Sequence, residues 1–397
     1  MRPVLALIFH PAAPPDAGPL VCALAEARLE LAERQRAAFM AAGADTTQIV
    51  AGPPDEFTFG ERLAAALRLT ATAVLGEAGE ERPSYAYGGR EPAGSGDMDG
   101  DRAAMGQVIQ GLIVLGSGSI PLARPSDLRR FVEVAAGPGG HALANNRYSA
   151  DVVAVSRAAD LAGLPPLPAD NALPRWLDER AGVAVADLRS RWRLGVDIDS
   201  PLDLILLRDS AARNLRAAAP LVGERLAALA DVTSNRRAEL LVAGRVSAST
   251  LAWLERGVAC RVRALVEERG LRAASALAQS GGVANTRPPR SILGELLDRD
   301  GPGSLAATVA QLADAAVIDT RVLLAHRLDC NDRAWPEPED RYASDLLLPG
   351  SIADPWLRDL TASATMAAPA GPILLGGHTL VNGGLRLLAE RARAGAR

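Results

Sequence analysis

The chain has 397 residues, of which 48% are hydrophobic and 23% are charged, and its formal net charge is −4. This length allows two or three domains with full hydrophobic cores. The negative charge and an aromatic content of only 4% argue against a nucleic-acid-binding protein. All 43 basic residues are arginines, which excludes a lysine nucleophile, a Schiff base and a P-loop lysine.

Cysteine usage and hydropathy predict a cytoplasmic protein. Cys22, Cys260 and Cys330 are far apart in the sequence and form no CxxC motif, which is typical of a reducing compartment. No apolar run reaches the ~20 residues that a transmembrane helix needs. We therefore expect neither a membrane nor a nucleic acid as a partner, and the sequence leaves the oligomeric state open.

The first half of the chain alternates strands and helices. Its predicted strands span residues 3–9, 46–52, 112–115 and 144–156. Its predicted helices span residues 20–42, 59–75 and 126–136, followed by a loop and short helix within 168–182 and a strand, acidic turn and helix over 193–210. A segment rich in Gly, Pro and charge at 76–106 is either a lid or partly disordered. The alternation predicts an α/β domain over 1–212 with a mostly parallel, Rossmann-like sheet.

The second half repeats this alternation without repeating the sequence. A helical connector over 213–235 precedes a second predicted α/β domain over 236–397. The predicted strands span residues 238–244, 260–268 and 315–325. The predicted helices span residues 248–257, 291–298, 303–313 and 354–367, and a strand, glycine turn and helix follow over 371–393.

An acidic turn, "GVDIDSPLDL" at 195–204, is the strongest chemical signal. Asp197 and Asp199 stand two residues apart at the end of a predicted strand, so both carboxylates would point to one side of the sheet. Two carboxylates at that end of a strand can hold Mg²⁺, where open α/β sheets bind their ligands. The alternative is a serine-capped helix entry with solvated acids, in which Pro201 occupies the first helical turn.

A glycine loop follows the predicted strand at 112–115. Gly116, Ser117, Gly118 and Ser119 separate this strand from a helix, and such a loop can hold a phosphate through backbone N–H groups. The alternative is a plain tight turn.

A polar cluster precedes the predicted strand at 144–156. Asn145, Asn146 and Arg147 could read a nucleotide base or an acceptor through hydrogen bonds. The alternative is a polar turn.

Two of these motifs resemble those of GT-A-like nucleotidyltransferases, in particular the small guanylyltransferases that act on phospholactate or the molybdenum cofactor. "VDIDSPLDL" is similar to the Asp-x-Asp-Thr-Pro-x-Asp-Leu turn of that superfamily, and "GSGSIPLARPSDL" shares the frame of its Gly-Asp-x-Pro-Leu-Leu-Thr-Pro-x-Asp-Leu motif. The resemblance extends over residues 1–210. It implies transfer of a nucleotidyl group from an NTP to a small phosphorylated acceptor. Asp197 and Asp199 would hold Mg²⁺, and the loop at 116–119 would hold phosphates.

The chain departs from the pattern of this superfamily at two places. Ser119 stands where the superfamily has a metal-binding aspartate, and "HPAAPPDAGP" replaces the glycine-rich nucleotide loop after the first strand. The alternative function is therefore a catalytically degenerate protein that binds or senses a nucleotide.

A third possibility places the active site in the second half. Asp319 and Arg321 lie near the end of one predicted strand, and His378 follows another. Because the carboxyl ends of parallel strands share one edge of a sheet, these side chains could converge. Histidine there would serve as an acid, a base or a phosphate donor.

Overall fold

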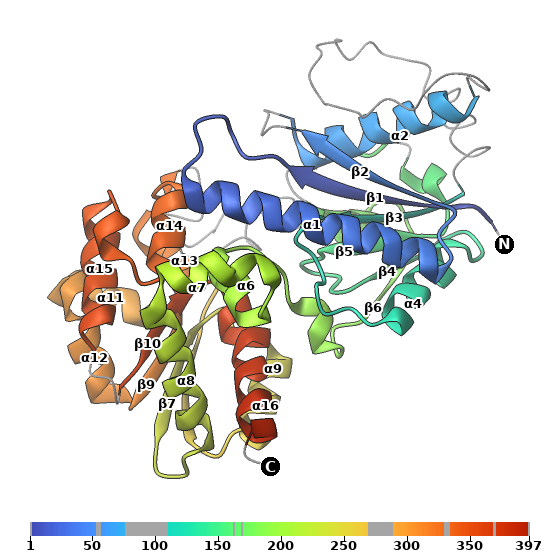
Figure 1. Cartoon of the computed structure of the whole chain (residues 1–397). Coiled ribbons are helices and arrows are strands. Elements are labelled where there is room, and N and C mark those ends of the chain that lie inside the picture. The colour runs from blue at the N-terminus through green and yellow to red at the C-terminus, as the bar shows by residue number, and fades with distance from the viewer. Residues whose placement is uncertain are drawn as a thin grey trace, which may run out of the picture. The chain divides into compact units, whose positions relative to one another are not determined.

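Figure 1 shows the computed structural model of the chain, which divides into two compact units. The first comprises Met1–Asp16 and Ala25–Asp197, and the second Ala17–Leu24 and Ile198–Arg397. The structure describes residues 2–52, 57–75, 110–161, 163–167, 170–268, 289–328, 334–367 and 371–395. The predicted insertion at 76–106 lies outside these residues.

The first unit is a layered α/β structure. Its strands are β1 (Val4–Pro11), β2 (Thr46–Gly52), β3 (Gly111–Gly116), β4 (His141–Ala144), β5 (Val152–Val155) and β6 (Ala184–Asp187). Its helices are α1 (Pro19–Ala42), whose first turns belong to the second unit, α2 (Phe59–Leu75), α4 (Pro125–Ala135) and α5 (Leu173–Glu179). The strand order is β2-β1-β3-β5-β4-β6, and β5 runs antiparallel to both of its neighbours.

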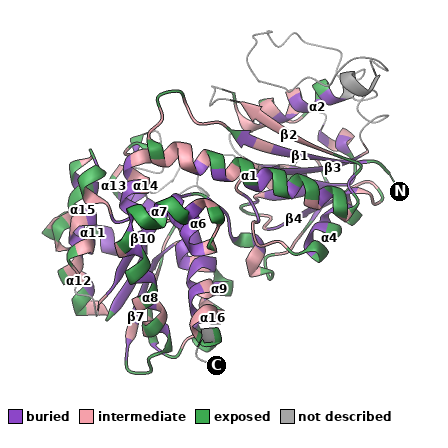
Figure 2. Cartoon of the chain, viewed as in Figure 1, coloured by how far each residue is buried: buried purple, intermediate pink, exposed green. Residues whose placement is uncertain are grey.

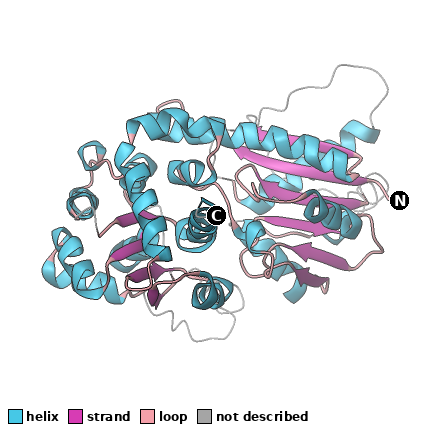
Figure 3. Cartoon of the chain, turned by 60° about the horizontal axis from the view of Figure 1, so that its bottom comes forward, coloured by secondary structure: helices cyan, strands magenta, loops and turns pink. Residues whose placement is uncertain are grey.

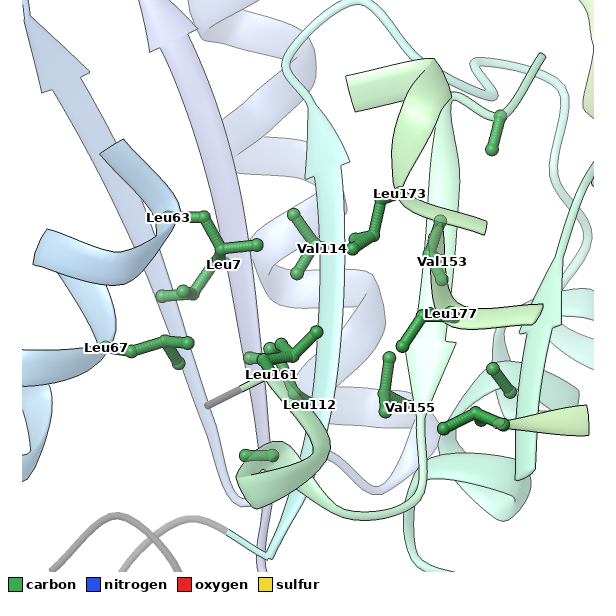
Figure 4. Packing of buried hydrophobic residues seen from close by; sticks show 14 of the residues in the cluster. Leu7, Leu63, Leu67, Leu112, Val114, Val153, Val155, Leu161, Leu173 and Leu177 are labelled. Carbon is green, nitrogen blue, oxygen red and sulfur yellow. The ribbon is translucent and has the colours of Figure 1, made fainter. Parts of the chain in front are cut away.

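Strand alternation divides the core of the first unit between the two faces of its sheet. Along β1, Leu5 and Leu7 pack on one face with residues of α2 and α5, as Figure 4 shows for Leu7, Leu63, Leu67, Leu173 and Leu177. Val4, Ala6 and Ile8 pack on the opposite face with residues of α1 and α4. A strand that is buried on both faces reads as a continuous apolar run, which is why "VLALIF" is so uniform.

The second unit surrounds a smaller sheet with helices (Figure 3). Its strands are β7 (Glu239–Gly244), β8 (Arg261–Val266), β9 (Ala315–Asp319) and β10 (Ile373–Gly376). Its helices are α6 (Pro201–Leu207), α7 (Arg213–Ala218), α8 (Pro220–Ser234), α9 (Ala248–Gly257), α11 (Ile292–Asp300), α12 (Leu305–Leu312), α13 (Thr320–Leu328), α14 (Pro338–Asp345), α15 (Pro355–Met366), a π-helical turn at Leu380–Gly384 and α16 (Leu385–Gly395). The strand order is β10-β9-β7-β8, and all three strand pairs are parallel. Figure 2 shows β9 and β10 within the buried interior.

The predicted two-domain α/β class is confirmed, and the first sheet is mixed because of β5. The division between the compact units follows Asp197, so α6 and the predicted connector belong to the second unit.

Glu339 anchors the first turn of α1 within the second unit. Both of its carboxylate oxygens accept a hydrogen bond from the N–H of Leu20, at 3.1 and 3.2 Å, and Oε2 also accepts one from Val21 at 3.1 Å. A Cβ atom at Gly18 would lie 2.4 Å from the Glu339 carboxyl carbon, so glycine permits this close approach. The carboxylate satisfies N–H groups that a helix start leaves without partners inside the helix.

Three predicted strand assignments are wrong in detail. The single strand predicted at 144–156 is two antiparallel strands, β4 and β5, joined by a turn. The strand predicted from residue 193 is instead a 3₁₀ turn at Trp192–Gly195 followed by residues outside any strand. The strand predicted at 315–325 ends at Asp319, and α13 follows directly, because a short apolar run suits a buried strand and a buried helix equally well.

Among the helices that the structure describes, none combines the length and the apolar character needed to cross a membrane.

The side chain of Phe39 fills the core on the α1 face of the first sheet, whereas Met40 beside it is 46% exposed. Phe39→Ala should lower the free energy of unfolding by about 3–5 kcal/mol, because it removes a fully buried aromatic ring and leaves a cavity. Met40→Ala is the matched control in the same helix. Urea unfolding followed by circular dichroism, with hydrogen exchange of β1 reporting on the first unit, would measure both. Equal losses in the two variants would contradict this core assignment.

Candidate functional site

Polar side chains of the second unit gather at the carboxyl edge of its sheet. Arg245 follows β7, Asp319 is the last residue of β9, and His378 comes two residues after β10. The chain proceeds from β7 to β8 on one side and to β9 and β10 on the other, so the strand order reverses between β7 and β9. Open α/β sheets bind ligands outside the carboxyl ends of their strands at such a point.

The central contact of this edge is an ion pair between Arg245 and Asp319. Nε of Arg245 donates to Oδ2 of Asp319 at 3.0 Å, and the backbone N–H of Arg321 donates to Oδ1 at 3.1 Å. The Asp319 side chain is fully buried, whereas that of Arg245 is 26% exposed. Burial by itself would raise the pKa of Asp319, but the charges of Arg245, Arg321 and His378 outweigh it and hold this pKa below its usual value. The carboxylate is therefore ionised inside the protein.

Gly244 makes this contact possible. Its φ is +129°, a conformation that side chains with a Cβ rarely adopt, and a Cβ there would lie only 2.3 Å from Cβ of Asp319. The end of β7 can therefore approach the end of β9 closely only with glycine at this position.

A second ion pair lies fully inside the unit. Nη1 and Nη2 of Arg321 donate to the two carboxylate oxygens of Asp345 at 2.5 and 2.6 Å, and Nη1 also donates to Thr320 at 2.8 Å. Burial alone would lower the pKa of Arg321, but the adjacent Asp345 raises it above its usual value, so the guanidinium stays charged. This pair fixes the start of α13, next to Asp319.

His378 faces Asp199, and both residues belong to the second unit, whereas the sequence predicts Asp199 in the first domain. Nδ1 of His378 lies 3.8 Å from Oδ2 of Asp199, a distance longer than a hydrogen bond. The two side chains are 26% and 53% exposed. Oδ2 of Asp203 accepts hydrogen bonds from the N–H groups of Asp199 at 2.9 Å and Ser200 at 2.8 Å, which fixes the turn that carries Asp199.

Asn382, in the π-helical turn after β10, ties two loops of this edge together. Its Nδ2 donates to the carbonyl oxygens of Arg245 at 2.9 Å and His378 at 2.8 Å. Its Oδ1 accepts from Ser247 N–H at 2.8 Å and from the Thr250 hydroxyl at 3.0 Å. All four bonding positions of the amide are used, and they hold the loops after β7 and β10 at a fixed spacing. Single π-helical turns are frequent at functional sites.

The predicted acidic pair is present, but it does not arise from a strand. Asp197 is buried and is the last residue of the first unit, and a single residue separates it from Asp199. The chain itself therefore places the two carboxylates together, with oxygens within 4.8 Å of one another. Because 197–199 lies outside any strand, the predicted alternation along a strand is the wrong reason for this proximity.

The glycine loop in the first unit bonds largely to its own surroundings. Ser117 N–H donates to Phe9 O at 2.9 Å and Ser119 N–H donates to Gly116 O at 3.0 Å. The Ser117 hydroxyl lies 3.1 Å from Nδ1 of His10, and the Gln35 amide donates to Ser119 O. Two of the amides considered for phosphate binding are thus engaged within the protein, which favours a tight turn at Gly116, Ser117, Gly118 and Ser119.

The Asn145 cluster likewise builds a turn. The Asn145 amide donates to Asp151 and to Leu194 O at 2.7 and 2.8 Å, and its oxygen accepts from the backbone N–H groups of Asp151 and Val152 at the start of β5. Asn146 Oδ1 accepts from Tyr148 N–H at 3.1 Å, and Arg147 pairs with Asp178. These contacts favour the polar turn over a base-reading cluster.

Sequence reasoning missed Arg245 and Asn382. Arg245 had a usable signal, because it directly follows a predicted strand that ends in glycine, and the rule that selected Asp319 and His378 applies to it equally. Asn382 had none, since its role comes from four contacts that only the folded chain creates.

Comparisons with known proteins assign no family. No family model matches the sequence, and no curated protein matches it. Among solved structures, the chain is similar to the crystal structure of Rv0371c from Mycobacterium tuberculosis H37Rv, with 16% sequence identity and a TM-score of 0.25. The match covers 47% of this chain and 88% of that chain. At this TM-score it supports no functional assignment.

The buried pair of Arg321 and Asp345 generates a stability prediction. Asp345→Asn should lower the free energy of unfolding by about 3–5 kcal/mol, because it leaves the Arg321 guanidinium buried without its counter-charge. Asp300→Asn, which alters an exposed pair with Arg299, should change stability little. Urea denaturation of both variants tests this prediction. Equal losses of stability in the two variants would show that the buried pair contributes no more to stability than the exposed pair.

His10 generates a prediction about pH. Burial, and to a lesser degree the charge of Arg28, hold the pKa of His10 below its usual value of 6.5. The unfolded chain therefore takes up a proton near pH 6.5 that the folded chain binds only at lower pH, so stability falls as the pH drops below 6.5. His10→Gln removes this group, so the free energy of unfolding should depend less steeply on pH. The decrease in steepness should correspond to at most about one proton bound per molecule.

The measurement is thermal unfolding between pH 7.5 and 5, with exposed His141→Gln as the control. An unchanged slope in His10→Gln would contradict the assignment.

Proposed function

We propose that the second unit binds a small phosphorylated molecule of the nucleotide class at the carboxyl edge of its sheet. The observation that carries this proposal is the Arg245–Asp319 pair at the point where the strand order reverses. Asp319 is the buried member of this ion pair, and Arg245 is the partly exposed member. The side of the pair that faces outward therefore carries the positive charge. A guanidinium held in this way meets a phosphate with its orientation already fixed.

The lysine-free composition supports an arginine in this role. Phosphate recognition in this chain must use arginine forks, backbone N–H groups, helix N-termini or a metal. Arg245 offers further N–H groups besides the Nε that bonds Asp319. The ten-residue helix α9 begins three residues later, with Ser247 as its N-cap, and its positive end adds to the attraction for an anion.

Nucleotidyl transfer with a divalent cation is the second candidate function. It is favoured by the acidic pair of Asp197 and Asp199, which would hold the cation, expected from the resemblance to be Mg²⁺. An acceptor phosphate oxygen would attack the α-phosphorus of an NTP, and pyrophosphate would leave with the electrons of the broken bond. The cation would offset charge on the α-phosphate during this step. Asp203 would keep Asp199 in place through the turn at 199–200.

Ligand-dependent thermal stability of the full chain tests the first proposal. ATP, GTP, CTP, UTP and pyrophosphate would each be added at rising concentration, and a ligand at ~100 times its Kd should stabilise the native protein by about 2.7 kcal/mol. Arg245→Lys should weaken binding by about 10–100-fold while keeping a positive charge beside Asp319, because an ammonium lacks the planar fork. Arg261→Gln, on the exposed edge strand β8, is the control.

The same titrations separate the two candidate functions. A stabilisation that requires Mg²⁺ and is lost in Asp197→Asn would support nucleotidyl transfer. A stabilisation without Mg²⁺ that Arg245→Lys weakens would support phosphate binding alone. Binding that is unchanged in Arg245→Lys would contradict the proposed role of this residue, and the absence of any stabilisation would contradict both functions.

A further inference from the structure

We propose that Asp199 and His378 of the second unit form a site for a first-row transition metal ion such as Mn²⁺, Co²⁺ or Zn²⁺, and that Asp197, two residues before Asp199, adds a nearby negative charge. This inference uses the acidic pair of the second candidate function but does not depend on a phosphorylated ligand. It goes beyond the expected Mg²⁺ because an imidazole joins the carboxylates, and it is the histidine that selects the class of metal.

The spacing of the donor atoms supports a shared ion. Nδ1 of His378 and Oδ2 of Asp199 are 3.8 Å apart, which is too long for a hydrogen bond. Two donors that each lie about 2.0–2.2 Å from one metal are separated by about 3–4 Å. The observed distance therefore suits two ligands of one ion better than a directly bonded pair.

The charges of the group also favour a cation. The carboxylates of Asp197 and Asp199 have oxygens within 4.8 Å of one another, and Asp197 is buried. Two negative charges at this distance attract a divalent cation more strongly than either charge does alone.

The chemistry of the donors decides which ion fits. Mg²⁺ prefers an octahedron of oxygens and retains much of its water, so a histidine ligand suits it poorly. Imidazole is a good ligand for Zn²⁺ and related first-row ions, and mixed carboxylate and imidazole sets are common for them. Asn382 bonds the carbonyl oxygen of His378, so the residue that carries the imidazole is anchored at its backbone.

The test is binding of the metal ion alone to the full, tag-free chain. Co²⁺ binding would be followed by visible absorption and Mn²⁺ binding by electron paramagnetic resonance, with Mg²⁺ as competitor. We expect a site that Co²⁺ and Mn²⁺ occupy at concentrations at least tenfold below that of Mg²⁺. His378→Gln should weaken Co²⁺ binding by at least the roughly 10–100-fold that loss of a supporting residue costs at metal sites. His141→Gln should leave binding unchanged.

A second variant, His378→Asp, tests the same site if His378→Gln folds poorly. His378→Asp replaces the imidazole by an oxygen ligand, so it should retain a cation site whose preference shifts toward Mg²⁺. Equal affinity of the native protein for Mg²⁺ and Co²⁺, with no effect of His378→Gln, would overturn the choice of metal. The absence of saturable binding for every ion would overturn the site, while leaving nucleotide binding through Arg245 open to its own test.

Discussion

The second unit depends on keeping one carboxylate ionised inside the protein. Asp319 ends a central strand, has no exposed surface, and would carry a large desolvation cost without the Arg245 side chain and the Arg321 amide around it. Those contacts require the end of β7 to come so close that only Gly244 fits. Arg321 is committed in turn to Asp345. The loop after β7, the end of β9 and the start of α13 are therefore parts of one arrangement, and the candidate site takes its shape from it.

The two units treat the same topological position differently. In the first unit, β1 has β2 on one side and β3 on the other, so its carboxyl edge also carries a reversal of strand order. There, however, the loop after β3 turns its amides toward carbonyl oxygens, and a serine–histidine contact closes it. In the second unit the corresponding edge presents a partly exposed arginine and histidine. The two edges therefore differ in the polar groups that they expose.

Local patterns predicted most of the elements and the α/β class, because buried strands and helices leave clear signals in hydrophobic spacing. They could not predict that β9 stops at Asp319, since the run after it is equally apolar as a helix. They selected Asp199 and His378 separately and assigned them to different domains. The contact between them depends on α6 belonging to the second unit, where a Cβ at Gly376 would lie 3.0 Å from Leu202. Packing of that kind involves residues far apart in the sequence, and no short motif records it.

The hydrogen bonds between Glu339 and the first turn of α1 have a consequence for folding during synthesis. The second unit contains Ala17–Leu24 as well as everything from Ile198 onward, so neither unit is one continuous piece of chain. A ribosome releases the segment that Glu339 holds more than three hundred residues before Glu339 itself. The N-terminal turn of α1 must therefore wait for the rest of its unit during synthesis. Dissection of the gene at the unit boundary would separate this turn from the carboxylate that caps it.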